Sequence, residues 1–265
     1  MISFNSLGNL GRLANQMFQY ASLKGIATNR GFNFVIPPQS KFGEVDPMVR
    51  NDPLSLYSAF DIGQKVTQGL YPHTMFYERM HTFDEELFNQ CPDNIDLFGY
   101  FQTEKYFKHI EDDIKKDFSF SKELNDTCED VINSLGGEDT ISLHIRRTDY
   151  VHNPNHPVQP IEYYQSALDK LPKDIPVIVF SDDPEWCENN DAFEDDRFAI
   201  SNNAPDLDLC LMTHCKYHII ANSSFSWWGA WLADSEKIIA PKNWFGATCT
   251  NKSVDDMSFG DWDWL

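Results

Sequence analysis

The alternation of strand-like and helix-like segments after Thr140 constrains the fold of this chain more than any other feature of its sequence. Short apolar runs (ISLHI, PVIVFS, RFAI, KYHIIA and KIIA) are separated by stretches with helical periodicity at about 161–171, 184–190, 205–214 and from Ser223 onward. Strands and helices that alternate at this spacing predict a parallel sheet with right-handed crossovers. Ligands of such sheets bind at the carboxyl ends of the strands, so the residues that follow each strand are the first candidates for a site.

The amino-terminal half opens with the same kind of unit. A strand in MISFNS leads through a glycine-bearing loop into a helix expected from about Ala14 to Asn29. Further strands are expected in FNFVI and IDLFGYFQ, helices at about 103–117 and 121–135, and short helices and loops at about 39–95. We therefore expect two α/β domains with a cleft between them, an amino-terminal one at 1–120 and a carboxyl-terminal one at 121–265.

The charge balance excludes one class of partner. Lys and Arg number 21 against 41 Asp and Glu, a formal charge of −20, whereas binding to a nucleic-acid backbone needs clustered positive charge. No nucleic-acid partner is expected, and the positions of the few arginines become informative. No apolar run is long enough to span a bilayer and the first residues lack a signal-peptide layout, which predicts a cytoplasmic protein.

The segment SLHIRRTDYV, residues 142–151, is the strongest functional signal. A strand ends there by delivering His144, Arg146, Arg147, Asp149 and Tyr150 into a loop. Two adjacent arginines in so acidic a chain suit a diphosphate group, because the guanidinium presents a planar fork of donors and stays charged. The alternative is a structural ion pair with Asp149 or a neighbouring acid, and it is stronger for Arg147 than for Arg146.

A second signal is IIANSSFSWWGAWL, residues 219–232, where small hydroxyl residues begin a helix after a strand. The exposed N–H groups at a helix start, with the positive end of the helix dipole, make Ser223 and Ser224 a candidate anion site. Ordinary helix capping by these serines is the alternative reading, and the two roles are compatible. We expect the three tryptophans that follow to be core residues.

Two further turns carry weaker signals. Asp182 and Asp183 follow the strand PVIVFS, and they suit either hydrogen bonds to a base or ribose or capping of the helix that begins at Pro184. Arg12 and Asn15 lie in the first strand-to-helix turn, GRLANQ, which lacks the spacing of a dinucleotide fingerprint.

One pattern resembles a metal site. Cys210, His214, Cys215 and His218 offer four zinc-type ligands within nine residues, but Cys215 faces another side of the expected helix and His218 lies in the next strand. No metal is therefore expected. Hydrolase and phosphotransferase signatures are also absent from the sequence, which has no nucleophile elbow and no Walker loop.

Taken together, GRLANQMFQYA, HIRRTDY, FSDDPEW and NSSFSWWGAWL resemble, in order and spacing, the α-1,2-fucosyltransferases of glycosyltransferase family 11, from about residue 8 to residue 245. The resemblance implies two Rossmann-like domains in a GT-B-like arrangement, the carboxyl-terminal one holding GDP-fucose and the amino-terminal one on the acceptor side. It also implies an inverting, metal-independent transfer of fucose to a glycan hydroxyl, α-1,2 to a galactose-type sugar. GDP-fucose would be a co-substrate, with no cofactor, and peripheral association with membrane glycan assembly stays open.

The resemblance also assigns roles to residues. Arg146 would bind the β-phosphate, supported by His144 and Arg147. Asp149 fits a general base by its location, and the alternative is that stabilisation of the leaving group alone suffices. Ser223, Ser224 and the Phe225 backbone would complete the diphosphate site, Asp182 or Asp183 would contact guanosine, and Arg12 and Asn15 would face donor and acceptor. Ala14 departs from the related pattern, which has a glycine there, and leaves open how closely the turn approaches a ligand.

Three alternatives remain at this stage. The chain could use another donor, such as GDP-mannose or a rhamnosyl nucleotide, on the same scaffold. It could be a nucleotide-sugar-binding protein that has lost activity. A dinucleotide-dependent oxidoreductase is the weakest, because the fingerprint is missing.

Overall fold

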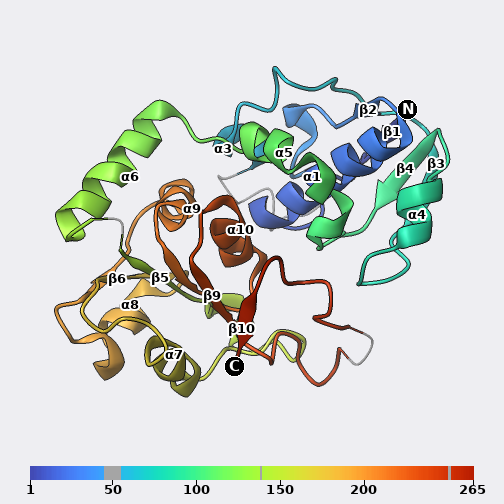
Figure 1. Cartoon of the computed structure of the whole chain (residues 1–265). Coiled ribbons are helices and arrows are strands. Elements are labelled where there is room, and N and C mark those ends of the chain that lie inside the picture. Colours follow the sequence, from blue (N-terminus) through green and yellow to red (C-terminus); the bar gives the residue numbers. More distant parts are fainter. Residues whose placement is uncertain (45–54, 138, 250–251) are drawn as a thin grey trace. The chain divides into compact units, whose positions relative to one another are not determined.

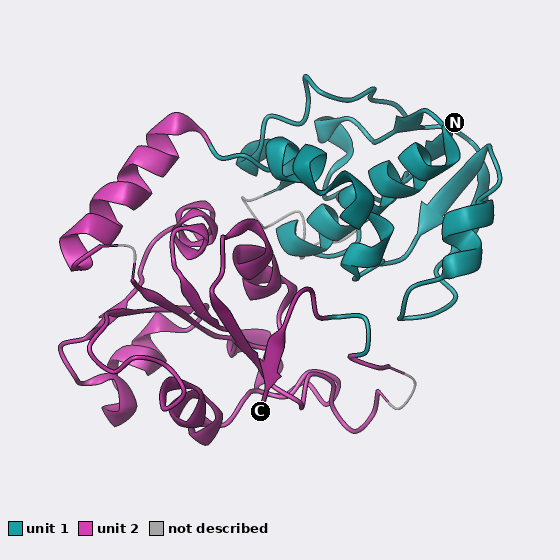
Figure 2. Ribbon diagram, in the orientation of Figure 1, with its two compact units in different colours: residues 1–120, 255–257 teal, residues 121–254, 258–265 magenta. Residues whose placement is uncertain are grey.

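The computed structural model describes residues 1–44, 55–137, 139–249 and 252–265. The chain forms two compact units (Figure 2). Unit 1 comprises residues 1–120 and 255–257, and unit 2 comprises residues 121–254 and 258–265. Each unit has its own sheet, and each is described separately.

Unit 1 is built on a four-stranded parallel sheet in the order β2-β1-β4-β3. Its strands are β1 (Ile2–Ser3), β2 (Phe34–Val35), β3 (Thr74–Tyr77) and β4 (Ile95–Phe98). Its helices are α1 (Leu13–Arg30), η1 (Gln39–Lys41), α3 (Leu56–Ala59), α4 (Glu85–Gln90), η2 (Glu104–Tyr106), η3 (Lys108–Ile110) and α5 (Glu111–Asp117).

Helix α1 is the central element of unit 1 and is buried over most of its length. It ends at Gly31, whose φ of 67° gives the left-handed cap that glycine adopts without strain. Within the helix, Gly25 allows a close approach, because a Cβ at this position would lie 2.0 Å from the carbonyl oxygen of Tyr106. The side-chain-free surface at Gly25 is thus what lets η2 lie directly against α1.

Unit 2 is built on a six-stranded parallel sheet in the order β10-β9-β8-β5-β6-β7. The strands are β5 (Ile141–Ile145), β6 (Val177–Ser181), β7 (Phe198–Ile200), β8 (Tyr217–Ile219), β9 (Lys237–Ala240) and β10 (Trp262–Trp264). From β5 the chain adds β6 and β7 in one direction, then returns to β8 and adds β9 and β10 in the other. This is the strand order of the doubly wound dinucleotide-binding fold, with its switch point between β5 and β8.

Helices cover both faces of this sheet (Figure 1). They are α6 (Lys122–Leu135), η4 (Thr148–Tyr150), α7 (Ile161–Leu168), α8 (Pro184–Glu188), η5 (Asp191–Phe193), α9 (Pro205–Thr213) and α10 (Ser224–Leu232). Strand β5 shows the two faces: Ile141, Leu143 and Ile145 pack into a core with Tyr164 of α7, while His144 bonds to a residue of α10. Successive side chains of a strand point to opposite faces, so both kinds of position are buried.

The expected α/β class is confirmed, and so is the strand and helix alternation after Thr140. Two strands were missed. β3 lies in the region expected to hold only loops and short helices, part of which, residues 45–54, is outside the described residues, and β3 itself is a mostly exposed edge strand with little apolar pattern. β10 lies in the acidic tail, to which no element was assigned, and pairs with β9.

The described helices include none that is both long enough and apolar enough to cross a membrane.

We expect Gly25→Ala to lower the free energy of unfolding by about 1–3 kcal/mol, the usual cost of overpacking. The helix-favouring effect of alanine, about 1 kcal/mol, is smaller than the cost of moving the backbone at Tyr106. Urea unfolding followed by circular dichroism measures the change. Gly63→Ala is the matched control, since a Cβ there meets only atoms 3.4 Å away or more; equal stability of the two variants would contradict the close approach.

We also expect a pH effect from His218, which is buried in β8 and donates a hydrogen bond from Nε2 to the Cys215 carbonyl at 3.0 Å. Burial lowers its pKa from 6.5 to about 4. Between these values the unfolded chain takes up a proton that the folded protein does not, so stability falls as pH falls, by at most about 1.4 kcal/mol per pH unit. The free energy of unfolding should therefore fall more between pH 7 and pH 5 in the wild type than in His218→Gln. Equal losses in the two proteins would show that His218 does not cause this pH effect.

Candidate functional site

The site expected from the sequence lies in unit 2, at the carboxyl ends of β5, β6 and β8. Arg146 follows β5, Asp182 follows β6, and Ser223 follows β8 by a few residues. Strands β5 and β8 pair with each other and flank the switch point, where the crossovers leave for opposite faces and open a crevice in folds of this kind. The topology therefore brings three of the sequence motifs to one edge of the sheet.

Arg146 is held between two carboxylates. Its guanidinium donates to Asp149 through Nη2 and forms an ion pair with Asp182, with 3.0 Å between Nη1 and Oδ2. The guanidinium carbon also lies 5.3 Å from the ring centre of Tyr150. With its side chain only 16% exposed, Arg146 is a preorganised cation at the switch point.

Arg147 points to a neighbouring set of groups. Its backbone N–H donates to Asp182 Oδ1 at 2.8 Å, and its Nε donates to Asp183 Oδ2 at 3.0 Å. The guanidinium stacks on Trp186, 3.9 Å from the ring centre. The ion-pair alternative that the sequence left open is thus present for both arginines, including Arg146, where it was less expected.

The two aspartates have different structural roles. Asp183 caps α8, accepting from the Trp186 N–H at 3.3 Å, and Pro184 follows in the first turn. Asp182 instead accepts from the backbone N–H of Arg147 and from the Thr148 hydroxyl, and so fixes the loop after β5. The capping explanation therefore holds for Asp183, whereas Asp182 pairs with the Arg146 guanidinium and fixes the backbone at Arg147.

His144 lies behind Arg146 and is buried, 4% exposed. Its Nδ1 shares a hydrogen bond of 2.8 Å with Ser226 Oγ on α10. Burial, reinforced by the positive charge of Arg146, lowers the pKa of His144 to about 3. The ring is neutral at physiological pH, so it can orient neighbouring groups but adds no positive charge for an anion.

The start of α10 lies at the same edge of the sheet, on the β8 side of the switch point. Ser223 is the N-cap residue, and its Oγ accepts from the Phe225 N–H at 3.3 Å. Ser224 is the first helical residue, and Trp227, Trp228 and Trp231 are buried, which confirms that the tryptophans belong to the core. Because Ser223 caps the helix with its side chain, an anion would meet the N–H groups that remain at this helix start.

Asn222 was not singled out in the sequence, yet it joins three loops. Its Nδ2 donates to the backbone carbonyl oxygens of Pro157 and Trp244, both at 3.0 Å. Its own backbone carbonyl oxygen accepts from the Tyr150 hydroxyl at 3.2 Å. Among the described residues, its Oδ1 is buried without a hydrogen-bond partner. The only sequence signal was its place between a strand and two serines.

Arg12 and Asn15 belong to unit 1, at the beginning of α1. Arg12 is the N-cap residue, and Asn15 Oδ1 accepts from Gln102 Nε2 at 2.7 Å. Gly11 precedes them with a φ of 80°, and a Cβ on it would meet the Asn15 side chain at 2.4 Å. Ala14, the departure from the pattern that the turn resembles, is 6% exposed and packed into the unit.

The four zinc-type residues noted in the sequence do not gather. Cys215 Sγ lies 3.4 Å from the Leu211 carbonyl, and His218 bonds to the Cys215 carbonyl. Within the described parts of the chain, the structure instead places Cys128 beside Cys210 and His214.

Relatives with known activities resemble this chain over most of its length. The O-antigen biosynthesis glycosyltransferase WbnK of Escherichia coli is 33% identical over 211 residues, 73% of this chain and 68% of that protein. An alpha-1,2-colitosyltransferase of Escherichia coli is 29% identical over 89% of this chain and 90% of its own. The galactoside alpha-(1,2)-fucosyltransferase 2 of Sus scrofa is 27% identical over 88% and 71%.

Solved structures agree on the fold. The fucosyltransferase NodZ from Bradyrhizobium superposes with a TM-score of 0.53 at 16% identity, covering 88% of this chain and 93% of its own. POFUT1 in complex with GDP-fucose gives 0.50 at 14% identity, covering 88% and 94%. These likenesses confirm the expected GT-B-like fold class.

The family assignment rests on the sequence itself. The model of the family described as "Glycosyl transferase family 11" matches residues 2–264, almost the whole chain. The chain therefore belongs to glycosyltransferase family 11.

Proposed function

We propose that this glycosyltransferase moves fucose from GDP-fucose to a hydroxyl of a glycan acceptor, forming an α-1,2 linkage to a galactose-type sugar, with inversion and without a catalytic metal. The observation that carries the proposal is the pair Arg146 and Arg147 at the switch point of unit 2, in a chain with a formal charge of −20. Relatives named as alpha-1,2 transferases and neighbours solved with GDP-fucose support the linkage and the donor.

Each of the two units would have its own role in the proposed reaction. Residues 121–265 would form the nucleotide-sugar domain, with Arg146, Arg147, Ser223, Ser224 and the Phe225 backbone around the diphosphate. Residues 1–120 would form the acceptor-side domain, with Arg12 and Asn15 at its first helix. Asp182 or Asp183 would contact the guanosine. The relative named as an O-antigen biosynthesis glycosyltransferase supports a glycan acceptor.

Charge development explains why Arg146 would matter. As the bond between fucose and the diphosphate breaks, negative charge grows on GDP, and a donor already fixed in place stabilises that charge without reorganisation. The carboxylates of Asp149 and Asp182 hold the guanidinium in place before any ligand binds. Asp149 would take the proton of the acceptor hydroxyl. The diphosphate would replace Asp149 as a partner of the Arg146 guanidinium, so donor binding would also free Asp149 to act as the base.

A second donor deserves the same test because of one relative. The alpha-1,2-colitosyltransferase covers 89% of this chain at 29% identity. Colitose is fucose without one ring hydroxyl, so the two donors share the diphosphate and guanosine contacts and differ only at the sugar. GDP-mannose or a rhamnosyl nucleotide remains as an alternative donor, and a nucleotide-sugar-binding protein without activity remains as an alternative function.

The first prediction concerns donor binding. GDP and GDP-fucose should raise the thermal midpoint of the protein, since a ligand at 100 times its dissociation constant stabilises the folded state by about 2.7 kcal/mol. GDP-colitose, GDP-mannose, UDP-galactose and NAD are measured alongside, each with and without chelator. A response to guanosine diphosphates alone, of the same size with chelator, is the expected pattern; a response only to UDP-galactose or NAD would overturn the donor.

The second prediction concerns catalysis. Arg146→Ala should lower kcat for fucosyl transfer by about 100- to 1000-fold, the cost of losing one preorganised donor, while the circular dichroism spectrum stays unchanged. Arg146→Lys should recover only part of the rate, because an ammonium keeps the charge and loses the planar fork.

Arg197→Ala is the control for this variant, since Arg197 precedes β7 at the opposite end of the sheet and donates to the Lys173 carbonyl. It should transfer fucose at the wild-type rate. Near-normal turnover by Arg146→Ala would remove Arg146 from the site.

A further inference from the structure

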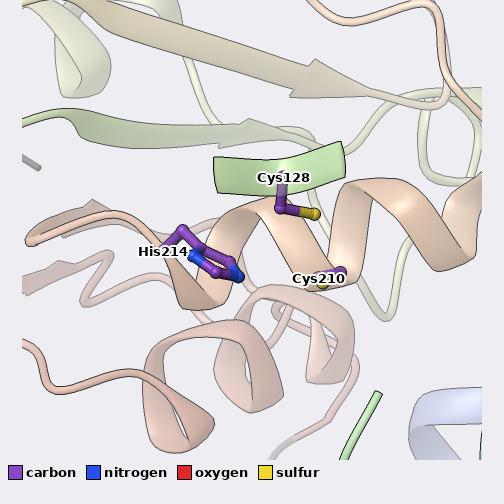
Figure 3. Close-up of side chains that lie close together, drawn as sticks. All are labelled: Cys128, Cys210 and His214. Atoms are coloured by element: carbon purple, nitrogen blue, oxygen red, sulfur yellow. The ribbon is translucent and has the colours of Figure 1, made fainter. Parts of the chain in front are cut away.

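Two helices of unit 2 bring together three side chains that are typical metal ligands. Cys128 comes from α6, and Cys210 and His214 come from α9 and the residue that ends it. Their sulfur and nitrogen atoms all lie within 4.8 Å of one another (Figure 3). The site proposed for the donor uses none of the three.

The local structure explains the grouping. Cys210 and His214 are four residues apart, so one turn of helix places them on the same face. Cys128 and Ile132 are the buried residues of α6, and this face lies toward α9. Both thiols are buried and the imidazole is half-buried.

The distances suit a tetrahedral ion. Zinc binds cysteine sulfur at about 2.3 Å and histidine nitrogen at about 2.0 Å, which sets neighbouring ligand atoms about 3.6–3.8 Å apart in a tetrahedron. The observed upper limit of 4.8 Å requires each pair to close by at most about 1.2 Å, within the reach of side-chain rotations.

A fourth ligand position is also provided. Asn125 lies one turn before Cys128 on α6, and its Oδ1 is 3.2 Å from His214 Nε2 and 3.6 Å from Cys210 Sγ. An amide oxygen, or a water bound to it, can complete four-coordination on the side that the three residues leave open.

The electrostatic surroundings favour a cation. Asp206 acts on Cys210, and Glu129 acts on His214, both through negative charge. Binding of a divalent ion to the two thiols would displace their protons to solvent.

We propose that Cys128, Cys210 and His214 form a zinc site that ties α6 to α9. Thiolate and imidazole ligands select zinc over magnesium or calcium, and a sheltered position between two helices suits a structural ion rather than a catalytic one. The ion would stabilise unit 2 by binding the folded state alone. The same three residues packed as an ordinary helix contact, without metal, is the alternative that the experiment must reject.

The test uses the full chain, stripped of metal under reducing conditions and titrated with Zn²⁺ and, separately, with Co²⁺ as a spectroscopic probe. One equivalent of Zn²⁺ should bind, and the thermal midpoint should rise with zinc concentration. The cobalt form should show the charge-transfer absorption of cobalt–thiolate bonds. No such absorption, or zinc binding without any thermal shift, would overturn the proposal.

Three variants, Cys128→Ser, Cys210→Ser and His214→Gln, should each lose more than about tenfold in zinc affinity, since even outer-shell changes at metal sites cost 10- to 100-fold. Cys249→Ser removes a thiol outside the cluster and should bind like the wild type. His214→Gln keeps both buried thiols, so it reports on binding even if a serine variant folds poorly. Wild-type zinc affinity in His214→Gln would refute the site.

A negative result in this experiment would not argue against the proposed transfer reaction, because the experiment measures metal binding. Chelator should lower the baseline thermal midpoint without changing the increment that GDP adds.

Discussion

The order of strands in unit 2 is the constraint on which the rest of that unit depends. Because the chain grows outward from β5 on one side and from β8 on the other, the connections after these two strands leave for opposite faces of the sheet. Their carboxyl ends cannot be covered by a common crossover, and polar residues can gather there at little cost to the core. Arg146 on one side and Ser223 on the other occupy this edge.

The arginines at this edge are arranged by the acids around them. Exposed ion pairs contribute little to stability, but the carboxylates of Asp149, Asp182 and Asp183 set where each guanidinium points. His144 contributes its shape and a hydrogen bond, because burial keeps its ring uncharged. The candidate site is therefore organised without ligand, as the proposed stabilisation of a charged leaving group would require.

Much of unit 2 could be predicted because its strands are buried on both faces and its helices carry regular apolar spacing. The gathering of Arg146, Asp182 and Ser223 followed from parallel strands ending at one edge. Side-chain pairing could not be predicted from the sequence, because it depends on contacts between distant segments. Examples are the hydrogen bond from the loop after β5 to Asp182, the three loops that Asn222 joins, and the approach of Cys128 to Cys210 across two helices. Strand β3 escaped notice because a mostly exposed edge strand needs no apolar alternation, and β10, with three residues, is too short for its alternation to be distinctive.

Because residues 255–257 belong to unit 1, the folding of that unit during synthesis depends on a segment far along the chain. Asp256 accepts from the backbone N–H of Phe83 at 2.6 Å and pairs with Lys105, so unit 1 takes one of its anchoring contacts from residues far along the chain. A ribosome adding about 5–20 residues each second needs on the order of ten seconds to reach Asp256 after Phe120 has been synthesised. During that interval the nascent first unit lacks its anchor, and a fragment that stops at Phe120 would lack it permanently.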